Sequence, residues 1–229
     1  MNSTLIFSRL LRHTAIVLAV ASVAVAISYE WVDRPVAFAV HNHGTNHVEI
    51  FKWLTYPPPW AQTWSPLVFG LLVVRRAWGP LEHWQKSLLV ACLSLMVANE
   101  FRTSIGDICG RYWPETWINN NPSLIGNGTY GFRFMELGSI GADIGSFPSG
   151  HSARIVGFAT VWWMVAPRIR WLLVIVSLPM LASLVLMNYH FVSDVIAGSV
   201  LGGIVGAYSV RLARLLPGPP RNSDLAQSP

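Results

Sequence analysis

Long apolar stretches alternate with shorter polar segments along most of the chain. Each approaches the roughly 20 residues that an α-helix needs to cross a bilayer. The pattern therefore predicts an all-α polytopic membrane protein, built as a bundle of six transmembrane helices. The six stretches cover about residues 13–30, 60–76, 87–102, 149–166, 171–188 and 191–213.

The first apolar stretch follows a short basic segment, an order that is also typical of a secretory signal peptide. Ala24-Val25-Ala26 would supply the small residues of a cleavage site. We expect the stretch to remain as the first helix, because it is long for a signal sequence. Residues 217–229 form a polar tail that contains proline, and we expect it to be disordered and cytoplasmic. Residues 1–216 then form a single transmembrane domain.

Composition supports a membrane protein and argues against other classes. Hydrophobic residues make up 52% of the 229 residues and charged residues only 12%. The net charge of +5 could suggest nucleic acid, but the basic residues lie in short clusters beside apolar stretches. No basic tract with interleaved aromatic residues is present, so we expect no nucleic-acid partner. Two cysteines, Cys92 and Cys109, are too few for a disulfide framework or a zinc site.

The positions of lysine and arginine predict the orientation. In the six-helix arrangement, one side carries far fewer basic residues, and the richer side is cytoplasmic. We therefore expect both termini inside the cytoplasmic (inner) membrane. The segment 103–147, the start of the fourth helix and the junction of the fifth and sixth then face outward, toward the periplasm. The richer side holds Arg9, Arg12, Arg75, Arg76, Lys86, Arg168, Arg170, Arg211, Arg214 and Arg221.

Two polar segments interrupt the apolar pattern. We expect residues 31–62 to be a polar loop that lies partly on the membrane interface through its aromatic residues. The histidines in this loop, His41, His43 and His47, have no cysteine partner and no fixed geometry, so we expect no metal there. Residues 103–147 form the longest polar segment, and a loop of that length in a compact protein is usually functional.

A helix start with phosphate-binding potential opens the fourth apolar stretch, at Ser146-Phe147-Pro148-Ser149-Gly150-His151. Proline suits a first helical turn, and Ser149 can cap it. The free N–H groups and partial positive charge of a helix N-terminus attract phosphate. Gly150 lets a ligand approach the backbone, and His151 can carry a proton near neutral pH. The same residues also open ordinary helices, so the site depends on what lies nearby.

Three other chemically active residues lie on the same predicted side. If residues 190–194 are helical, His190 and Asp194 share one face, and the carboxylate can orient the imidazole. This favours His190 as a nucleophile and His151 as a proton donor. Arg111 offers a planar cation suited to phosphate. Each residue alone also has a structural explanation: a packed histidine, an acidic helix N-terminus or an arginine that reaches the membrane surface.

Taken together, these motifs resemble a known family. Phe147-Pro148-Ser149-Gly150-His151, followed by His190-x-x-x-Asp194 and Val195-Ile196-Ala197-Gly198, resembles the type-2 phosphatidic acid phosphatase superfamily of membrane lipid phosphatases, over about residues 100–205. The resemblance implies six helices, hydrolysis of phosphate monoesters or pyrophosphates, and no metal or other cofactor. It also implies that His190 attacks phosphorus, Asp194 orients it and His151 protonates the leaving oxygen. The residues that it implies hold the phosphate are Arg111, Ser149 and Gly150.

The sequence lacks three basic residues that are usual in the family's motifs. Arg154 lies three residues after His151, so on a helix it shares roughly the same face. An arginine within an apolar helix is costly without an anionic partner, which favours phosphate binding. Arg102 can also reach inward, although a pairing with Glu100 or Asp107 is an alternative. We take both arginines as candidate phosphate-binding residues. The positions that lack the usual base hold Gly106, Trp113 and Leu184.

The sequence thus predicts a metal-independent lipid phosphatase that works at the outer face of the cytoplasmic membrane through a phosphohistidine. Candidate substrates are lipid A, undecaprenyl pyrophosphate and phosphatidyl-type lipids. Transfer of the phosphate to another lipid is one alternative, and lipid binding without catalysis is another. The expected partners are the lipid phosphate and the surrounding membrane lipids.

Overall fold

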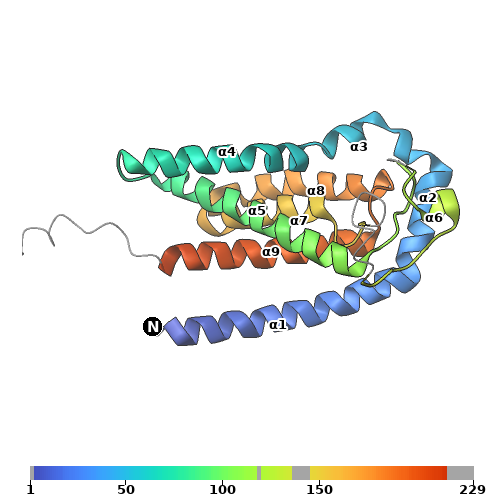
Figure 1. The fold of residues 1–229 in the computed structure, drawn as a ribbon, viewed down its shortest axis with the longest axis horizontal. Coiled ribbons are helices and arrows are strands. Elements are labelled where there is room, and N and C mark those ends of the chain that lie inside the picture. The colour runs from blue at the N-terminus through green and yellow to red at the C-terminus, as the bar shows by residue number, and fades with distance from the viewer. Residues whose placement is uncertain (1–2, 118–119, 136–144, 216–229) are drawn as a thin grey trace, which may run out of the picture.

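The computed structural model describes residues 3–117, 120–135 and 145–215 (Figure 1). Within these ranges the chain folds into helices joined by loops, and the strand-like pairings are two isolated bridges. This confirms the predicted all-α class. The tail predicted at 217–229 lies outside the described residues. The two bridges join Arg111 to Phe132 and Trp113 to Ser123.

The helices follow the predicted apolar stretches and extend beyond most of them. The third stretch was predicted at 87–102, but its helix continues to Cys109 and so reaches into the polar segment. The elements in order are α1 (Ser3–Ile27), the π-helical turn η1 (Ser28–Val32), α2 (Asp33–His43), η2 (Thr45–His47), α3 (Glu49–Leu54), α4 (Pro57–Ala77), α5 (His83–Cys109), α6 (Leu124–Asn127), α7 (Gly150–Val165), η3 (Pro167–Ile169), α8 (Arg170–Leu186) and α9 (Val192–Leu215).

The segment 31–62 is largely helical, so the prediction of a loop there was wrong. α1 continues through η1 into α2, and α2 ends at Gly44, whose φ of 67° suits glycine. Asp33, Ala37 and Val40 are the buried residues of α2, and their spacing places them on one helical face. This face packs toward α6, α8 and α9, so tertiary contacts stabilise a helix whose overall polarity suggested a loop.

Four helical stretches among the described residues are long and apolar enough to cross a membrane, which supports an integral membrane protein. α4 and α7 are outside this set, so the predicted count of six is not confirmed. α7 has 16 residues, a length of about 24 Å. It packs against α5, α8 and α9, so it does not need an apolar surface on every side. The four stretches are Phe7–His43, His83–Cys109, Pro167–Leu186 and Val192–Leu215.

Glycines let α7 and α9 pack directly against each other. A Cβ atom at Gly198 would lie 2.3 Å from the carbonyl oxygen of Ser149, and one at Gly202 would lie 2.3 Å from that of Ala153. A Cβ at Gly206 would also be too close to the α7 backbone, at 2.7 Å. These three glycines form a stripe along α9 that allows close helix packing. As a result, the first turn of α9 lies beside the first turn of α7.

The two ends of the bundle differ in their charge. Figure 1 shows the start of α1, the α4–α5 connection and the end of α9 at one end, with α2, α3 and α6 at the other. A cavity lined by Lys86, Val165 and Arg214 joins the start of α5 to the ends of α7 and α9. The described basic residues that predicted the cytoplasmic side belong to this end. The starts of α7 and α9, with the candidate catalytic residues, lie at the opposite end.

Candidate active site

The two candidate catalytic histidines lie face to edge. His151 is the second residue of α7, and His190 lies in the turn between α8 and α9. Their ring centroids are 5.7 Å apart and the ring planes meet at 64°. His190 is buried, with 3% of its surface exposed, whereas His151 is half-buried. A phosphate held at the edge of this pair can therefore contact both imidazoles.

The hydrogen bonds of His190 define which ring nitrogen is free to react. Its Nδ1 lies 3.0 Å from the carbonyl oxygen of Ser146 and 3.8 Å from Oδ2 of Asp194. Because a carbonyl oxygen only accepts, we assign the proton to Nδ1, which leaves the lone pair of Nε2 available. The ring lies within ion-pair distance of the Asp194 carboxylate, four residues further along the chain. The Ser146 carbonyl is the nearer partner.

Asp194 is fully buried and organises the turn around His190. Its Oδ2 accepts hydrogen bonds from Ser146 Oγ (2.6 Å) and from the backbone N–H of Phe191 (2.9 Å). Its Oδ1 accepts from Arg111. Asp194 thus fixes both Ser146, which bonds the histidine, and the backbone beside His190. It orients the imidazole through these neighbours more than by direct contact.

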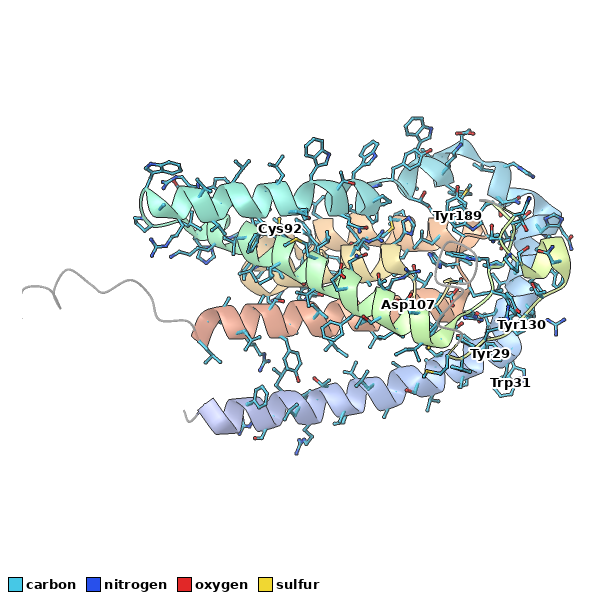
Figure 2. All side chains as sticks on the ribbon, viewed as in Figure 1. Tyr29, Trp31, Cys92, Asp107, Tyr130 and Tyr189 are labelled. Atoms are coloured by element: carbon cyan, nitrogen blue, oxygen red, sulfur yellow. The ribbon has the colours of Figure 1, made fainter. Side chains whose placement is uncertain are left out.

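Arg111 is fully buried behind Asp194. One terminal nitrogen donates to Asp194 and to Ser193 Oγ (2.5 Å), and the other donates to Asp33 (2.7 Å). Four aromatic rings surround the guanidinium, which lies 4.3 Å from the Phe191 centroid. The sequence predicted that Arg111 binds the phosphate, but these contacts favour a role in positioning Asp194. The other rings are Tyr29, Tyr130 and Phe132, of which Figure 2 labels the first two.

Asp33 belongs to this network, and the sequence reasoning missed it. It is 1% exposed, and its Oδ1 accepts from the backbone N–H of Ser193 at 3.0 Å. It therefore links α2 to the first turn of α9 as well as to Arg111. The signal that could have found it is an acidic residue within a long helical span, where ionisable groups are costly.

Ser149 caps α7 as predicted. Its Oγ accepts from the backbone N–H of Ser152 at 3.3 Å, and its own N–H donates to the carbonyl of Asp194 at 3.0 Å. Ser149 thus fixes α7 to α9 directly. The N–H groups that follow, at Gly150 and His151, have no acceptor within the helix because of their position. These groups, more than the Ser149 hydroxyl, are available to a phosphate.

Arg102 and Arg154 converge on Gly150. A Cβ atom there would lie 3.2 Å from Arg102 Nε and 3.3 Å from a terminal nitrogen of Arg154. Glycine at this position therefore leaves room for two guanidinium groups at the N-terminus of α7. Arg154 shares roughly the face of His151, as its spacing predicted, and its side chain reaches this end of the helix.

The contacts of the two arginines leave their charge available. Arg102 donates to the carbonyl oxygens of Gly145 and Pro148, the latter at 3.0 Å. Arg154 Nε donates to Oδ1 of Asn99 at 2.9 Å. Among the described residues, the ion pairs are formed by other side chains, so the alternative pairing of Arg102 with an acid is not seen. Two guanidinium groups beside His151 suit a phosphate.

Two of the positions that lack the family's usual basic residue lie inside the site. Leu184 is fully buried, and its backbone carbonyl accepts from the N–H of His190 at 3.1 Å. Trp113 is 6% exposed, and its ring centroid lies 5.4 Å from that of His190. Trp113 therefore places an aromatic ring beside His190, at a position where the family motif usually has a basic residue.

The histidines of the 31–62 segment take separate roles. His41 pairs with Glu115 at 3.1 Å, and His43 bonds the backbone of its own helix at Ala39. His47 lines a pocket together with Glu115. In the part of the chain that the structure describes, no three side chains of the metal-ligating types come together.

Comparison with known proteins decides the family. The sequence model of the PAP2 superfamily matches residues 87–216, more than half of the chain. The chain belongs to the PAP2 superfamily. This match includes both histidines, Asp194 and both candidate phosphate-binding arginines, and it confirms the resemblance seen in the motifs.

A solved structure shares the fold of this PAP2 protein. The crystal structure described as the first transmembrane PAP2 type phosphatidylglycerolphosphate phosphatase, from Bacillus subtilis, aligns with a TM-score of 0.55 and 13% identity. The alignment covers 88% of this chain and 96% of that one. No curated protein sequence matches the chain. Family and fold together support a membrane-embedded lipid phosphatase.

Proposed function

We propose that this PAP2 protein hydrolyses the phosphate or pyrophosphate head group of a lipid through a phosphohistidine formed on His190. The observation that carries the proposal is the pairing of His190 with His151 at the start of α7, where Arg102 and Arg154 meet at Gly150. A nucleophile, a proton donor and two cations are thus present at one helix N-terminus.

In the first step, the Nε2 lone pair of His190 attacks phosphorus and the bond from phosphorus to the leaving oxygen breaks. His151 transfers its proton to that oxygen, so the lipid alcohol or lipid phosphate leaves in a protonated form. The phosphorylated ring of His190 keeps its Nδ1 proton, and this N–H donates a hydrogen bond to the Ser146 carbonyl. The positive charge of this ring is balanced by the buried Asp194 nearby.

In the second step, water attacks phosphorus and the nitrogen–phosphorus bond breaks. His151, now neutral, accepts a proton from the water as the new oxygen–phosphorus bond forms. Inorganic phosphate leaves, and Nε2 of His190 regains its lone pair. His151 therefore serves as acid and then as base, and the cycle closes without a net change in either histidine.

Charge on the phosphoryl oxygens is stabilised in both steps by Arg102, Arg154 and the free N–H groups of the first turn of α7. Phosphoryl transfer depends chiefly on such fixed charges, because negative charge spreads over the equatorial oxygens. Arg111 acts one layer behind, where it holds Asp194 in place. Arg102 and Arg154 take the role of the cations that the motif positions lack.

The position of the site favours the outer face of the cytoplasmic membrane. The basic clusters lie at the opposite end of the bundle, which by the charge rule is cytoplasmic. The substrate is then a lipid whose phosphate lies at the periplasmic surface. Lipid A, undecaprenyl pyrophosphate and phosphatidyl-type lipids are the candidates.

The proposal is tested by purified protein in detergent, incubated with each of these lipid phosphates. We expect inorganic phosphate to be released from at least one lipid, at the same rate with and without excess chelator. His190→Ala is the control and should release none. If no lipid yields phosphate but one still binds, the protein is a lipid-binding member of the fold. Recovery of the phosphate on a second lipid would show a phosphotransferase.

A further inference from the structure

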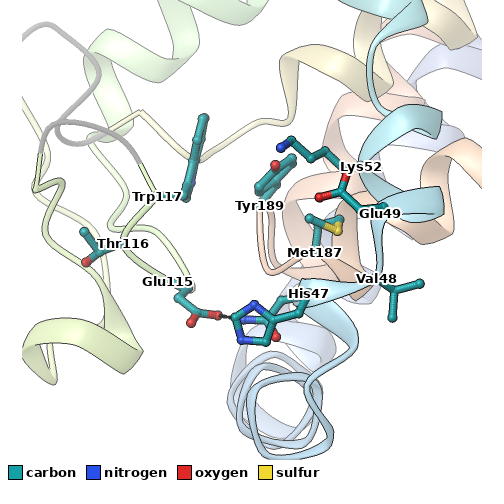
Figure 3. Close-up of a pocket in the computed structure, with 10 residues that line it drawn as sticks. His47, Val48, Glu49, Lys52, Glu115, Thr116, Trp117, Met187 and Tyr189 are labelled. Carbon is teal, nitrogen blue, oxygen red and sulfur yellow. Dashed lines mark hydrogen bonds between the residues drawn. The ribbon is translucent and has the colours of Figure 1, made fainter.

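A polar pocket of about 330 Å³ lies beside the candidate active site and has no part in the chemistry above. It opens between the α2–α3 connection, the segment that follows Trp113, and the turn that precedes α9. Figure 3 shows side chains from all three segments around the opening. The residues that matter for its chemistry are Asn46, Glu49, Lys52, Trp117 and Tyr189.

The pocket is separated from the nucleophile by one layer of aromatic rings. Tyr189 directly precedes His190, and its ring centroid lies 4.9 Å from that of Trp117. The Trp117 ring is 5.2 Å from Trp113, whose ring is 5.4 Å from His190. A group bound in the pocket can therefore belong to the same molecule whose phosphate is at His190.

The walls of the pocket combine flat apolar faces with hydrogen-bonding groups of both kinds. Trp117 is 41% exposed and, with Tyr189, offers aromatic surface. Lys52 supplies a donor and Glu49 an acceptor (Figure 3). Such walls suit a ring that presents C–H groups on one face and hydroxyl groups at its edge.

Asn46 adds an unsatisfied acceptor to this pocket. Its amide nitrogen donates to Glu115 at 2.9 Å, which fixes the direction of the side chain. Its Oδ1 is buried and has no hydrogen-bond partner among the residues that the structure describes. A buried acceptor without a donor is unfavourable, so a ligand that brings a hydroxyl group gains binding energy here.

The charges of the pocket argue against a second phosphate. Glu49 and Glu115 both line it, against the single ammonium group of Lys52. Glu115 is already bonded by His41, Asn46 and Asn188. An anionic group would meet net negative charge, whereas a neutral hydroxylated group would not.

We propose that this pocket binds the hydroxyl-bearing head group, a sugar or similar polyol, of the lipid phosphate that is cleaved at His190. This inference rests on the proposed function and names its substrate class. Lipids with a hydroxylated group next to the phosphate should be preferred over phosphatidic acid, which has none. The acyl chains then extend toward the membrane-spanning helices.

The test compares two substrates with the same acyl chains, a diacylated glucosamine 1-phosphate and phosphatidic acid. We expect Trp117→Ala and Lys52→Met to lower the ratio of the two kcat/KM values about tenfold, because only the sugar contacts these side chains. Trp171→Ala is the matched control, since that tryptophan is 79% exposed at the start of α8. It should leave the ratio as in wild type. A ratio that stays constant in the pocket variants overturns the proposal.

A binding measurement separates this inference from the proposed function. Titration calorimetry in detergent would compare glucosyl diacylglycerol with diacylglycerol, neither of which carries phosphate. We expect wild type to bind the glucosyl lipid at least about tenfold more tightly, and Trp117→Ala to lose that difference. Equal binding of the two lipids by wild type overturns the inference, even if lipid phosphates are hydrolysed. If the protein has no phosphatase activity but still binds the glucosyl lipid more tightly, the inference about the pocket stands and the proposed reaction is wrong.

Discussion

Asp33 and Asp194 bind the two terminal nitrogens of one arginine, Arg111, and all three side chains are buried. Asp33 belongs to α2 and Asp194 to α9, so the arginine links the N-terminal helices to the candidate active site. Two carboxylates and one guanidinium leave one net negative charge next to His190. This charge suits an imidazole that becomes positive when phosphorus is attached.

Asp33→Asn should lower both stability and kcat. Loss of the carboxylate leaves a buried cation short of one partner, at a cost of about 3 kcal/mol. Arg111 would then neutralise Asp194, so we expect kcat to fall at least about tenfold while KM changes less than about twofold. Thermal unfolding in detergent and steady-state kinetics measure the two effects. Glu30→Gln, an exposed acid in the preceding turn, is the control. Wild-type kcat in Asp33→Asn would show that the second carboxylate has no role in catalysis.

His190→Ala should abolish turnover, and His151→Ala should lower it by about 10²–10⁴, the usual contribution of a general acid–base group. A radioactive phosphoryl group should be trapped on wild type during turnover and be absent from His190→Ala. His43→Ala provides the matched control, because that exposed histidine bonds only its own helix backbone. The assignment fails if His190→Ala turns over near the wild-type rate.

Arg154→Ala should lower kcat/KM at least about tenfold, equivalent to about 1.4 kcal/mol of transition-state stabilisation. The reason is its position beside Gly150, where charge accumulates on the phosphoryl oxygens in the proposed reaction. Arg168→Ala, at the opposite end of the bundle, should leave kcat/KM unchanged. An unchanged value in a correctly folded Arg154→Ala would mean that Arg102 and the helix N-terminus suffice.

The acidic limb of the kcat/KM profile should lie below pH 6.5, the ordinary pKa of histidine. Burial lowers the pKa of His190, and this outweighs the opposing effects of Asp194 and the Ser146 carbonyl. Arg102 lowers this pKa further, and His151 faces the ring from α7. Because the neutral ring is the nucleophile, a lowered pKa keeps it active at more acidic pH. On the acidic side, activity should fall as the pH drops through that lower pKa.

Rate measurements across pH test this prediction, and Asp194→Asn sharpens it. Removal of the carboxylate takes away a group that raises the pKa of His190, so the acidic limb should move to still lower pH. An acidic limb above pH 6.5 in wild type would mean that His190 is not the group that titrates.

A cysteine at Asn120 should react with a membrane-impermeant thiol reagent applied to intact spheroplasts, and one at Arg168 should not. The two positions lie at the active-site end and at the basic end of the bundle. The background is Cys92→Ala with Cys109→Ser, which removes both native thiols. Labelling of Arg168→Cys alone would reverse the orientation and place the substrate on the cytoplasmic face.

Local patterns were enough to predict the long apolar helices and to recognise the family from its motifs. The starts of α7 and α9 and the cap at Ser149 follow from short-range rules on capping and apolar runs. The glycines at 198, 202 and 206 follow a helical period, a pattern that is typical of close helix packing. Arg154 was found because a charge in an apolar helix needs a reason.

The remaining features depend on contacts between distant segments. Asp33 and Arg111 are far apart in the sequence, so no local pattern shows that they share an ion pair. The helical character of 31–62 depends on burial of one face of α2 against elements that come much later. The preference of His190 for the Ser146 carbonyl likewise depends on how the segment before α7 crosses the α8–α9 turn.

The glycine stripe of α9 also determines where this protein can change during evolution. At Gly198 and Gly202 the atoms opposite are backbone carbonyls of α7, which cannot rotate aside as a side chain can. Alanine there would push the two helices apart and separate His151 from His190. Apolar positions on the outer surface accept many different residues, because lipid can pack around side chains of different shapes. The spacing of the candidate catalytic pair is thus encoded in positions that have no side chain.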